Sequence, residues 1–163
     1  MAETRMGLVP DLWFENFVVG QRFTTRGATL SEAQILEFAL QWDPQPFHLD
    51  KIAAARSPYG GLIASGFQTL LVAFRLLYQE RVINAASLGA PGIDEMRWHV
   101  PVRPGDTLRV EGEVVEVRPS RSRADRGTVT IQYSVFNQHG EKVMSFRVPH
   151  LMQRRPPTTD EPA

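Results

Sequence analysis

The chain has 163 residues, of which 42% are hydrophobic and 22% are charged. These proportions are ordinary for one globular domain with a buried core. Eighteen Lys and Arg residues balance eighteen Asp and Glu residues, which argues against a general nucleic-acid binder, because such proteins carry a basic excess to pair with phosphates. The sequence contains no cysteine, which excludes disulfides, thiolate metal sites and a cysteine nucleophile.

Neither end of the sequence carries a recognisable export or membrane signal. The first residues, MAETRMGLVPDLW, lack the apolar core of a signal peptide, and no apolar run is long enough to span a bilayer. We therefore expect a cytoplasmic protein with neither a membrane nor a nucleic acid as its partner. One domain is predicted over residues 8–152, and the proline-rich, charged residues 153–163 are expected to form a disordered tail.

The first third of the chain predicts a strand followed by a helix. Alternating residues over 20–29 are typical of a strand. Ser31 and Gln34 then have the spacing of a capping box, with an apolar helical face behind them. Pro44 and Pro46 cannot continue this helix, so we expect it to end near Trp42 and a stiff loop to follow. Further along, Asp50 is placed to cap a short helix that runs through Ala55.

The most apolar segment of the sequence is ASGFQTLLVAFRLLYQ, residues 64–79. Apolar side chains occupy one helical face and much of the other. A helix of this composition is expected to be buried on nearly all sides. The sequence therefore predicts a central helix that forms the core of the domain.

After Pro91 the period of the hydrophobic pattern changes from that of a helix to that of a strand. Strands are predicted over 94–102, from Leu108, from Val129, and around Phe146, with short turns between them. Short connections favour antiparallel neighbours. The fold class is therefore α+β: a single domain in which an antiparallel sheet wraps around a buried central helix, the architecture of the hot-dog fold.

The loop WDPQPFHLD, residues 42–50, is the stretch most suggestive of chemistry. It places a carboxylate, Asp43, five residues before an imidazole, His48, with two prolines between them that fix φ. A stiffened loop can hold both groups toward one water, as an acid–base pair requires. The alternative is that Asp43 simply turns the chain before Pro44 and that His48 is a polar residue with structural hydrogen bonds.

A second candidate element, GGLIASGF, leads into the apolar segment at residues 60–67. The start of a helix exposes unpaired N–H groups and a partial positive charge. Gly66 would let a substrate carbonyl approach the backbone, so its N–H is a candidate oxyanion donor. The alternative is that Gly60 and Gly61 form a turn and that Gly66 permits tight packing.

Together, residues 31–69 resemble the core signature of the MaoC-like dehydratase and (R)-specific enoyl-CoA hydratase family. That family has an aspartate, four intervening residues, a histidine, and an acidic residue two positions on, which Asp43, His48 and Asp50 match. A small residue and a glycine then enter the central helix, as Ser65 and Gly66 do here. A later Pro-x-x-Pro-Gly-Asp stretch, at residues 101–106, also resembles the family.

The sequence departs from the family pattern at two positions beside the aspartate. Trp42 stands where glycine is common, and Gln45 stands where asparagine is usual. We expect Trp42 to contact the substrate and to narrow or reshape the pocket. Gln45 is expected to supply the hydrogen bonds of the loop.

The resemblance implies a lyase that acts on an acyl-CoA thioester without a metal or a redox cofactor. Asp43 and His48 would hold and deprotonate a water that attacks C3 of a 2-enoyl thioester. The N–H of Gly66 would stabilise the enolate oxygen, and Ser65 would contact the substrate. The resemblance also implies a homodimer or a higher homo-oligomer, with the acyl channel at the interface between subunits.

Several arginines lie in the run VRPSRSRADRG, and two of them, Arg121 and Arg123, are candidates to bind the phosphates of CoA. A homodimer could bring this run near the pocket of a partner. The alternative interpretation is a solvated hairpin tip.

The remaining polar candidates are weaker. His99, His139 and His150 have no metal-ligand spacing and are interpreted as surface or packing residues. Ser65 lacks the Gly-x-Ser-x-Gly elbow of a nucleophile. Two other functions stay open: an acyl-CoA thioesterase and a non-catalytic acyl-CoA binding protein. Thioesterases of this fold place a carboxylate on or beside the central helix, whereas residues 65–78 contain no Asp or Glu, which favours the hydratase.

Overall fold

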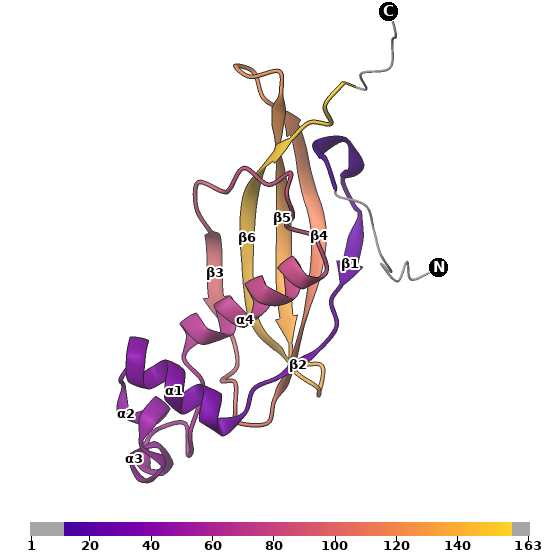
Figure 1. Cartoon of the computed structure of the whole chain (residues 1–163). Coiled ribbons are helices and arrows are strands. Elements are labelled where there is room, and N and C mark those ends of the chain that lie inside the picture. Colours follow the sequence, from indigo (N-terminus) through magenta and orange to yellow (C-terminus); the bar gives the residue numbers. More distant parts are fainter. Residues whose placement is uncertain (1–11, 158–163) are drawn as a thin grey trace, which may run out of the picture.

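The computed structural model describes residues 12–157. A short 3-10 helix comes first, two short strands and four helices follow, and four further strands complete the chain (Figure 1). In chain order the elements are η1 (Phe14–Asn16), β1 (Arg22–Thr24), β2 (Ala28–Thr29), α1 (Glu32–Trp42), α2 (Pro46–Leu49), α3 (Lys51–Arg56), α4 (Gly66–Gln79), β3 (Asp94–Trp98), β4 (Thr107–Pro119), β5 (Arg126–Phe136) and β6 (Lys142–Gln153).

The strands form one antiparallel sheet in the order β1-β4-β5-β6-β3, with β2 also paired to β4. Hairpins join β4 to β5 and β5 to β6, and the second hairpin turns at Gly140, whose φ is +78°. Few residues other than glycine adopt this left-handed backbone without strain. The antiparallel sheet expected from the alternating sequence pattern is therefore confirmed.

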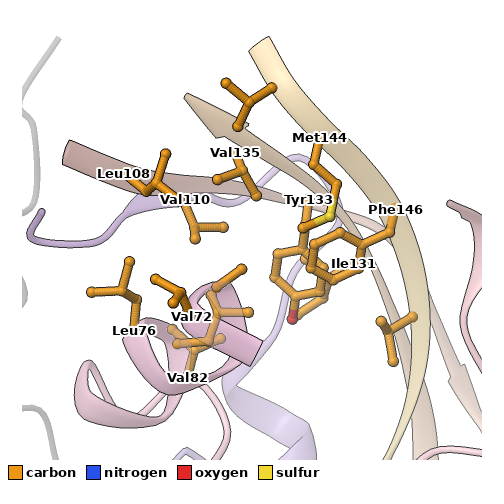
Figure 2. Packing of buried hydrophobic residues seen from close by; sticks show 14 of the residues in the cluster. Val72, Leu76, Val82, Leu108, Val110, Ile131, Tyr133, Val135, Met144 and Phe146 are labelled. Atoms are coloured by element: carbon orange, nitrogen blue, oxygen red, sulfur yellow. The ribbon is translucent and has the colours of Figure 1, made fainter. Parts of the chain in front are cut away.

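Helix α4 crosses one face of this sheet, and the core lies between them (Figures 1 and 2). Figure 2 shows Val72 and Leu76 of the helix opposite Val110 and Leu108 of β4, with Tyr133 and Phe146 beside them. Burying one such aliphatic side chain stabilises the fold by about 1.5–3 kcal/mol. The side chains of the core that are less than 2% exposed include Ile35, Leu76, Leu77, Leu108, Val110, Val114, Val129, Ile131, Tyr133, Val135 and Met144.

The expectation that α4 is buried on nearly all sides is wrong for the single chain. One face of the helix is open: Leu71, Phe74 and Tyr78 are each 50–60% exposed. The reason is geometric, because a sheet covers only the side of a helix that faces it. The sequence cannot distinguish an apolar face that packs on the sheet from one that is left for another surface.

The helices before α4 gather at one end of the sheet (Figure 1). The predicted capping box of α1 is confirmed: Ser31 accepts the N–H of Gln34, and the Gln34 side chain accepts the N–H of Ser31. α1 ends at Trp42, as predicted, and Asp50 caps α3 by accepting the N–H groups of Ile52 and Ala53. The stiff loop expected between these helices contains one further turn of helix, α2, which begins at Pro46.

Three boundaries differ from the sequence-based prediction. The strand expected over 20–29 is broken into β1 and β2, and the strand expected over 94–102 ends at Trp98. Gly27 lies in the first break, where a Cβ would press against the Thr107 side chain. The predicted tail begins at Gln153, which is the last residue of β6, while residues 158–163 of that tail lie outside the described part of the chain. Between residues 12 and 157, no helix is long and apolar enough to cross a membrane.

Candidate active site

The end of α1 and the single turn of α2 position the acid–base pair. Asp43 is the C-cap of α1, where its N–H donates to the carbonyl of Ala39. Pro46 begins α2, because proline suits the first position of a helix, where no N–H partner is needed. His48 follows within that turn, and only 4% of its surface is exposed. The two prolines therefore end one helix and begin the next, and they bring the two side chains to the same place.

Asp43 and His48 approach each other closely. The distance from Asp43 Oδ2 to His48 Nε2 is 3.3 Å, and their side chains are 13% and 5% exposed. The other ring nitrogen of His48, Nδ1, lies 2.8 Å from the carbonyl oxygen of Ile63. A carbonyl can only accept, so Nδ1 must donate. In neutral His48 the lone pair is therefore at Nε2, which is the nitrogen that can take up a proton beside Asp43.

Ser65 connects this pair to α4. Its hydroxyl donates to Asp43 Oδ2 over 2.6 Å and accepts the N–H of Phe67 as the N-cap of the helix. The side chain of Gln45 donates from Nε2 to the other carboxylate oxygen, Asp43 Oδ1, over 2.8 Å. Each oxygen of the carboxylate thus has a hydrogen-bond donor, and Asp43 is fixed from two directions.

These contacts decide the charge of Asp43. Burial alone would raise the pKa of its carboxyl group, but the hydrogen bonds from Ser65 and Gln45, together with nearby His48, outweigh burial and hold that pKa below its ordinary value. Asp43 is therefore a carboxylate at neutral pH. The site combines a fixed anion with an imidazole nitrogen that can gain or lose a proton.

A cavity of about 430 Å³ opens onto the pair, and its size lies toward the small end of the range for ligand sites. Gly66, the first residue of α4, also lines this cavity. The first N–H groups of a helix have no partner within it, so a carbonyl bound here would find a donor. The other lining residues are Gln45, Phe47, Tyr59, Ile63, Ala64, Phe67, Thr69, Trp98, His99, Val100, Pro101, Val102 and Val143.

The structure gathers part of the set of candidate residues taken from the sequence. Asp43, His48, Ser65 and Gly66 come together, and Ser65 holds the aspartate directly. Trp42, expected to narrow the pocket, does not line this cavity; its side chain is 73% exposed and borders a second hollow between α1 and α4. Successive residues of a helix point about 100° apart, so the residue before Asp43 faces elsewhere.

The arginine run lies at the far end of the molecule from the acid–base pair. Arg121 and Arg123 belong to the turn between β4 and β5, whereas α2 lies at the opposite end of the sheet (Figure 1). β4 spans 13 residues between these ends, about 40 Å at the rise of a strand. Within one chain, neither arginine reaches the cavity.

Sequence reasoning missed three contributions to the site. The carbonyl of Ile63 orients His48, and Trp98 packs against Gly66 so closely that a Cβ added there would overlap the indole ring. His99 is exposed, as its interpretation as a surface residue predicts, but it also lines the cavity, and its Nε2 shares a hydrogen bond of 2.8 Å with the Ser145 hydroxyl. All three contributions depend on contacts between residues distant in the sequence. Only His99 could have been suspected from its residue type, because histidine is common in catalytic sites. Over residues 12–157, no group of three or more acidic or histidine side chains could hold a metal ion.

Comparisons with known proteins place this geometry in a family. The model of the MaoC like domain matches residues 14–137. Among solved structures, the MaoC-like dehydratase from Rhodospirillum rubrum superposes with a TM-score of 0.84 at 42% identity, covering 89% of this chain and 99% of that one.

Curated relatives extend the comparison. The uncharacterized protein YdeM of Bacillus subtilis is 32% identical over 86% of this chain and 98% of its own length. The 3-hydroxybutyryl-CoA dehydratase of Methylorubrum extorquens is 33% identical over 69% of this chain and 70% of its own. With an antiparallel sheet around α4 and a family match over most of its length, the chain belongs to the MaoC-like dehydratase family and has its hot-dog fold.

Proposed function

We propose that this protein adds water to a 2-enoyl-CoA thioester, or removes water from the corresponding 3-hydroxyacyl-CoA, by acid–base catalysis. The observation that carries the proposal is the 3.3 Å approach of Asp43 Oδ2 to His48 Nε2 beside the first residue of α4. Its relatives include a dehydratase of a CoA thioester. An acid–base pair next to unpaired helix N–H groups matches what such a reaction needs.

In the hydration direction, a water held between Asp43 and His48 attacks C3 of the enoyl group. The oxygen of the water forms a bond to C3, and one of its protons passes to the pair. Because His48 Nδ1 donates its hydrogen to the carbonyl of Ile63, Nε2 is the nitrogen that can receive that proton. The carboxylate of Asp43 stabilises the imidazolium that results, because the two groups already lie at ion-pair distance.

The same step moves electrons from the double bond onto the thioester oxygen, which becomes an enolate. In the proposed mechanism the N–H of Gly66 at the start of α4 donates to that oxygen, aided by the positive end of the helix dipole. C2 then takes a proton from the pair, and the double bond is fully hydrated. Addition of water is not a redox reaction, so the proposed chemistry needs no redox cofactor, and the proposal assigns its proton transfers to Asp43 and His48 without a metal.

The proposal extends to the CoA part of the substrate and to the assembly of the chains. We propose that the protein works as a homodimer and that Arg121 and Arg123 of one subunit bind the phosphates of CoA held by the other. Within a single chain these arginines lie at the wrong end of the sheet (Figure 1). The phosphates of CoA are suitable partners for guanidinium groups.

An assay with paired readouts tests the function against its alternatives. Purified protein is incubated with crotonyl-CoA and with saturated butyryl-CoA, and the absorbance of the conjugated enone is followed separately from free thiol. The proposal predicts loss of enone absorbance with crotonyl-CoA and no thiol release. Thiol release from either thioester would instead identify a thioesterase, and binding without any turnover would identify a non-catalytic acyl-CoA protein.

A further inference from the structure

The cavity is bounded on the Gly66 side by one large side chain, Trp98. This residue ends β3, the edge strand of the sheet, where it pairs with Met144 of β6. Between Asp94 and Arg97 the register of the strand shifts, and Glu95 adopts a φ of +50°. Such irregularities turn the side chains that follow them. The indole of Trp98 accordingly lies over α4, against Gly66.

A continuous series of contacts joins Trp98 to the reacting centre. The indole packs on Gly66, the next residue back is Ser65, and the Ser65 hydroxyl binds Asp43. Because of this series, an acyl group whose C3 lies at the acid–base pair must be close to the indole. The acyl part of a thioester bound in this way would meet Trp98, and the acyl part is what distinguishes one substrate from another.

Trp98 also separates the cavity from solvent. Half of its surface is exposed, while it lines the cavity on the other side and meets the Phe67 ring edge-on at 5.9 Å. By contrast, the walls formed by Val102 and Val143 are 3% and 1% exposed and belong to the core. Those walls cannot be moved without disturbing the fold, whereas the side chain of Trp98 lies at the surface, outside the buried core. A substitution of Trp98 can therefore remove one wall of the cavity without disturbing the core.

We propose that Trp98 is a specificity-determining residue that limits the length of the acyl chain and favours short acyl thioesters. This inference rests on the proposed function, because it names the substrate class of that same site. A chain that extends from the acid–base pair along the Gly66 side of the cavity would meet the indole. Misfits of even one methylene in a hydrophobic pocket change discrimination by about 10-fold or more, so removing the ring should alter selectivity strongly.

The test compares Trp98→Ala, Trp98→Phe and the wild-type protein on 2-enoyl-CoA thioesters of four and eight carbons. We expect the ratio of kcat/KM for eight over four carbons to rise at least ~10-fold in Trp98→Ala. Trp98→Phe should retain most of the wild-type preference because it restores an aromatic wall. Trp42→Ala examines the other tryptophan near the pair, and we expect its ratio to match that of the wild type.

The binding of saturated butyryl-CoA and octanoyl-CoA to the same variants is measured by calorimetry, which needs no turnover. If hydration proceeds but Trp98→Ala changes neither the kcat/KM ratio nor the ratio of the affinities for octanoyl-CoA and butyryl-CoA, the inference is wrong and the proposed function stands. If no enoyl-CoA is hydrated but Trp98→Ala shifts binding toward octanoyl-CoA, the inference stands and the proposed function is wrong. A shift produced by Trp42→Ala instead of Trp98→Ala would also overturn the inference, and failure to bind either thioester would overturn both.

Discussion

Ser65 donates its hydroxyl hydrogen to Asp43 Oδ2 over 2.6 Å while it accepts the N–H of Phe67 as the cap of α4. One buried side chain thus fixes both the carboxylate and the start of the helix that carries Gly66. Asp43 and Ser65 lie 22 residues apart in the sequence. This one hydroxyl therefore holds the carboxylate next to the start of α4.

Replacing Ser65 with alanine should therefore shift the pH profile as well as lower the rate. The Ser65 hydrogen bond holds down the pKa of Asp43, so its loss raises that pKa and moves the acid limb of kcat/KM to higher pH. A hydrogen bond to a charged group contributes about 1.5–3 kcal/mol, which corresponds to a loss of roughly 10-fold or more in rate. Ser65→Thr, which keeps a hydroxyl, is the matched control. An unchanged acid limb in Ser65→Ala would show that the hydroxyl does not tune Asp43.

Gly66 has two separable roles that a pair of variants can distinguish. A Cβ at this position overlaps the Trp98 indole, so Gly66→Ala should lower the melting temperature. Adding Trp98→Ala makes room for the methyl group and should restore that temperature. The rate should stay low in the double variant if the methyl group also keeps the thioester away from the N–H. Recovery of both stability and rate would mean that Gly66 serves packing alone.

The stability of the fold should depend on pH through a buried histidine outside the cavity. His150 is 6% exposed, shares a hydrogen bond of 2.7 Å between its Nε2 and the Tyr133 hydroxyl, and has its pKa lowered by burial from 6.5 to about 4. Between these values the unfolded chain binds more protons than the folded one. Stability is therefore complete above pH 6.5 and is lost as the pH falls toward 4, by a total of about 3 kcal/mol.

Urea unfolding at a series of pH values measures this effect. His150→Gln keeps a partner for the Tyr133 hydroxyl but removes the titrating ring, so its stability should vary less between pH 6.5 and 4 than that of the wild type. Equal slopes in the two proteins would assign the pH dependence to other groups.

The open face of α4 predicts a homodimer. Leu71, Phe74 and Tyr78 form an apolar stripe along this face, and contiguous patches of this kind mark surfaces that pair. Light scattering at micromolar concentration should give twice the monomer mass of 18.4 kDa. Placing a charge in the stripe, as in Phe74→Glu, should shift the protein toward the monomer. A wild-type protein of monomer mass would remove this stripe as an interface.

Local signals in the sequence predicted the helix boundaries around the candidate site, whereas contacts between distant segments could not be predicted. The capping box at Ser31, the end of α1 before Pro44, and the cap at Asp50 could be predicted because each depends on residues within one helical turn. The contact of Trp98 with Gly66 could not be predicted, because it arises only when β3 packs against α4. The contact of His48 with Ile63 could not be predicted either, because it arises only when α2 folds against the segment that precedes α4. The exposed face of α4 could not be predicted, because the sequence does not show which apolar face of the helix the sheet covers.

The central claim is that Asp43 and His48 act together on one water, and the rate of enone hydration by three variants tests it directly. Asp43→Asn keeps the size of the side chain and much of its hydrogen bonding but cannot serve as the carboxylate, and His48→Gln removes the acid–base nitrogen. Each should lower the hydration of crotonyl-CoA by at least ~100-fold, with little loss of thermal stability. The double variant should be little slower than the slower single variant, because residues that act as a unit are not additive. Full activity of Asp43→Asn with a large fall in melting temperature would contradict the account and make Asp43 a loop former.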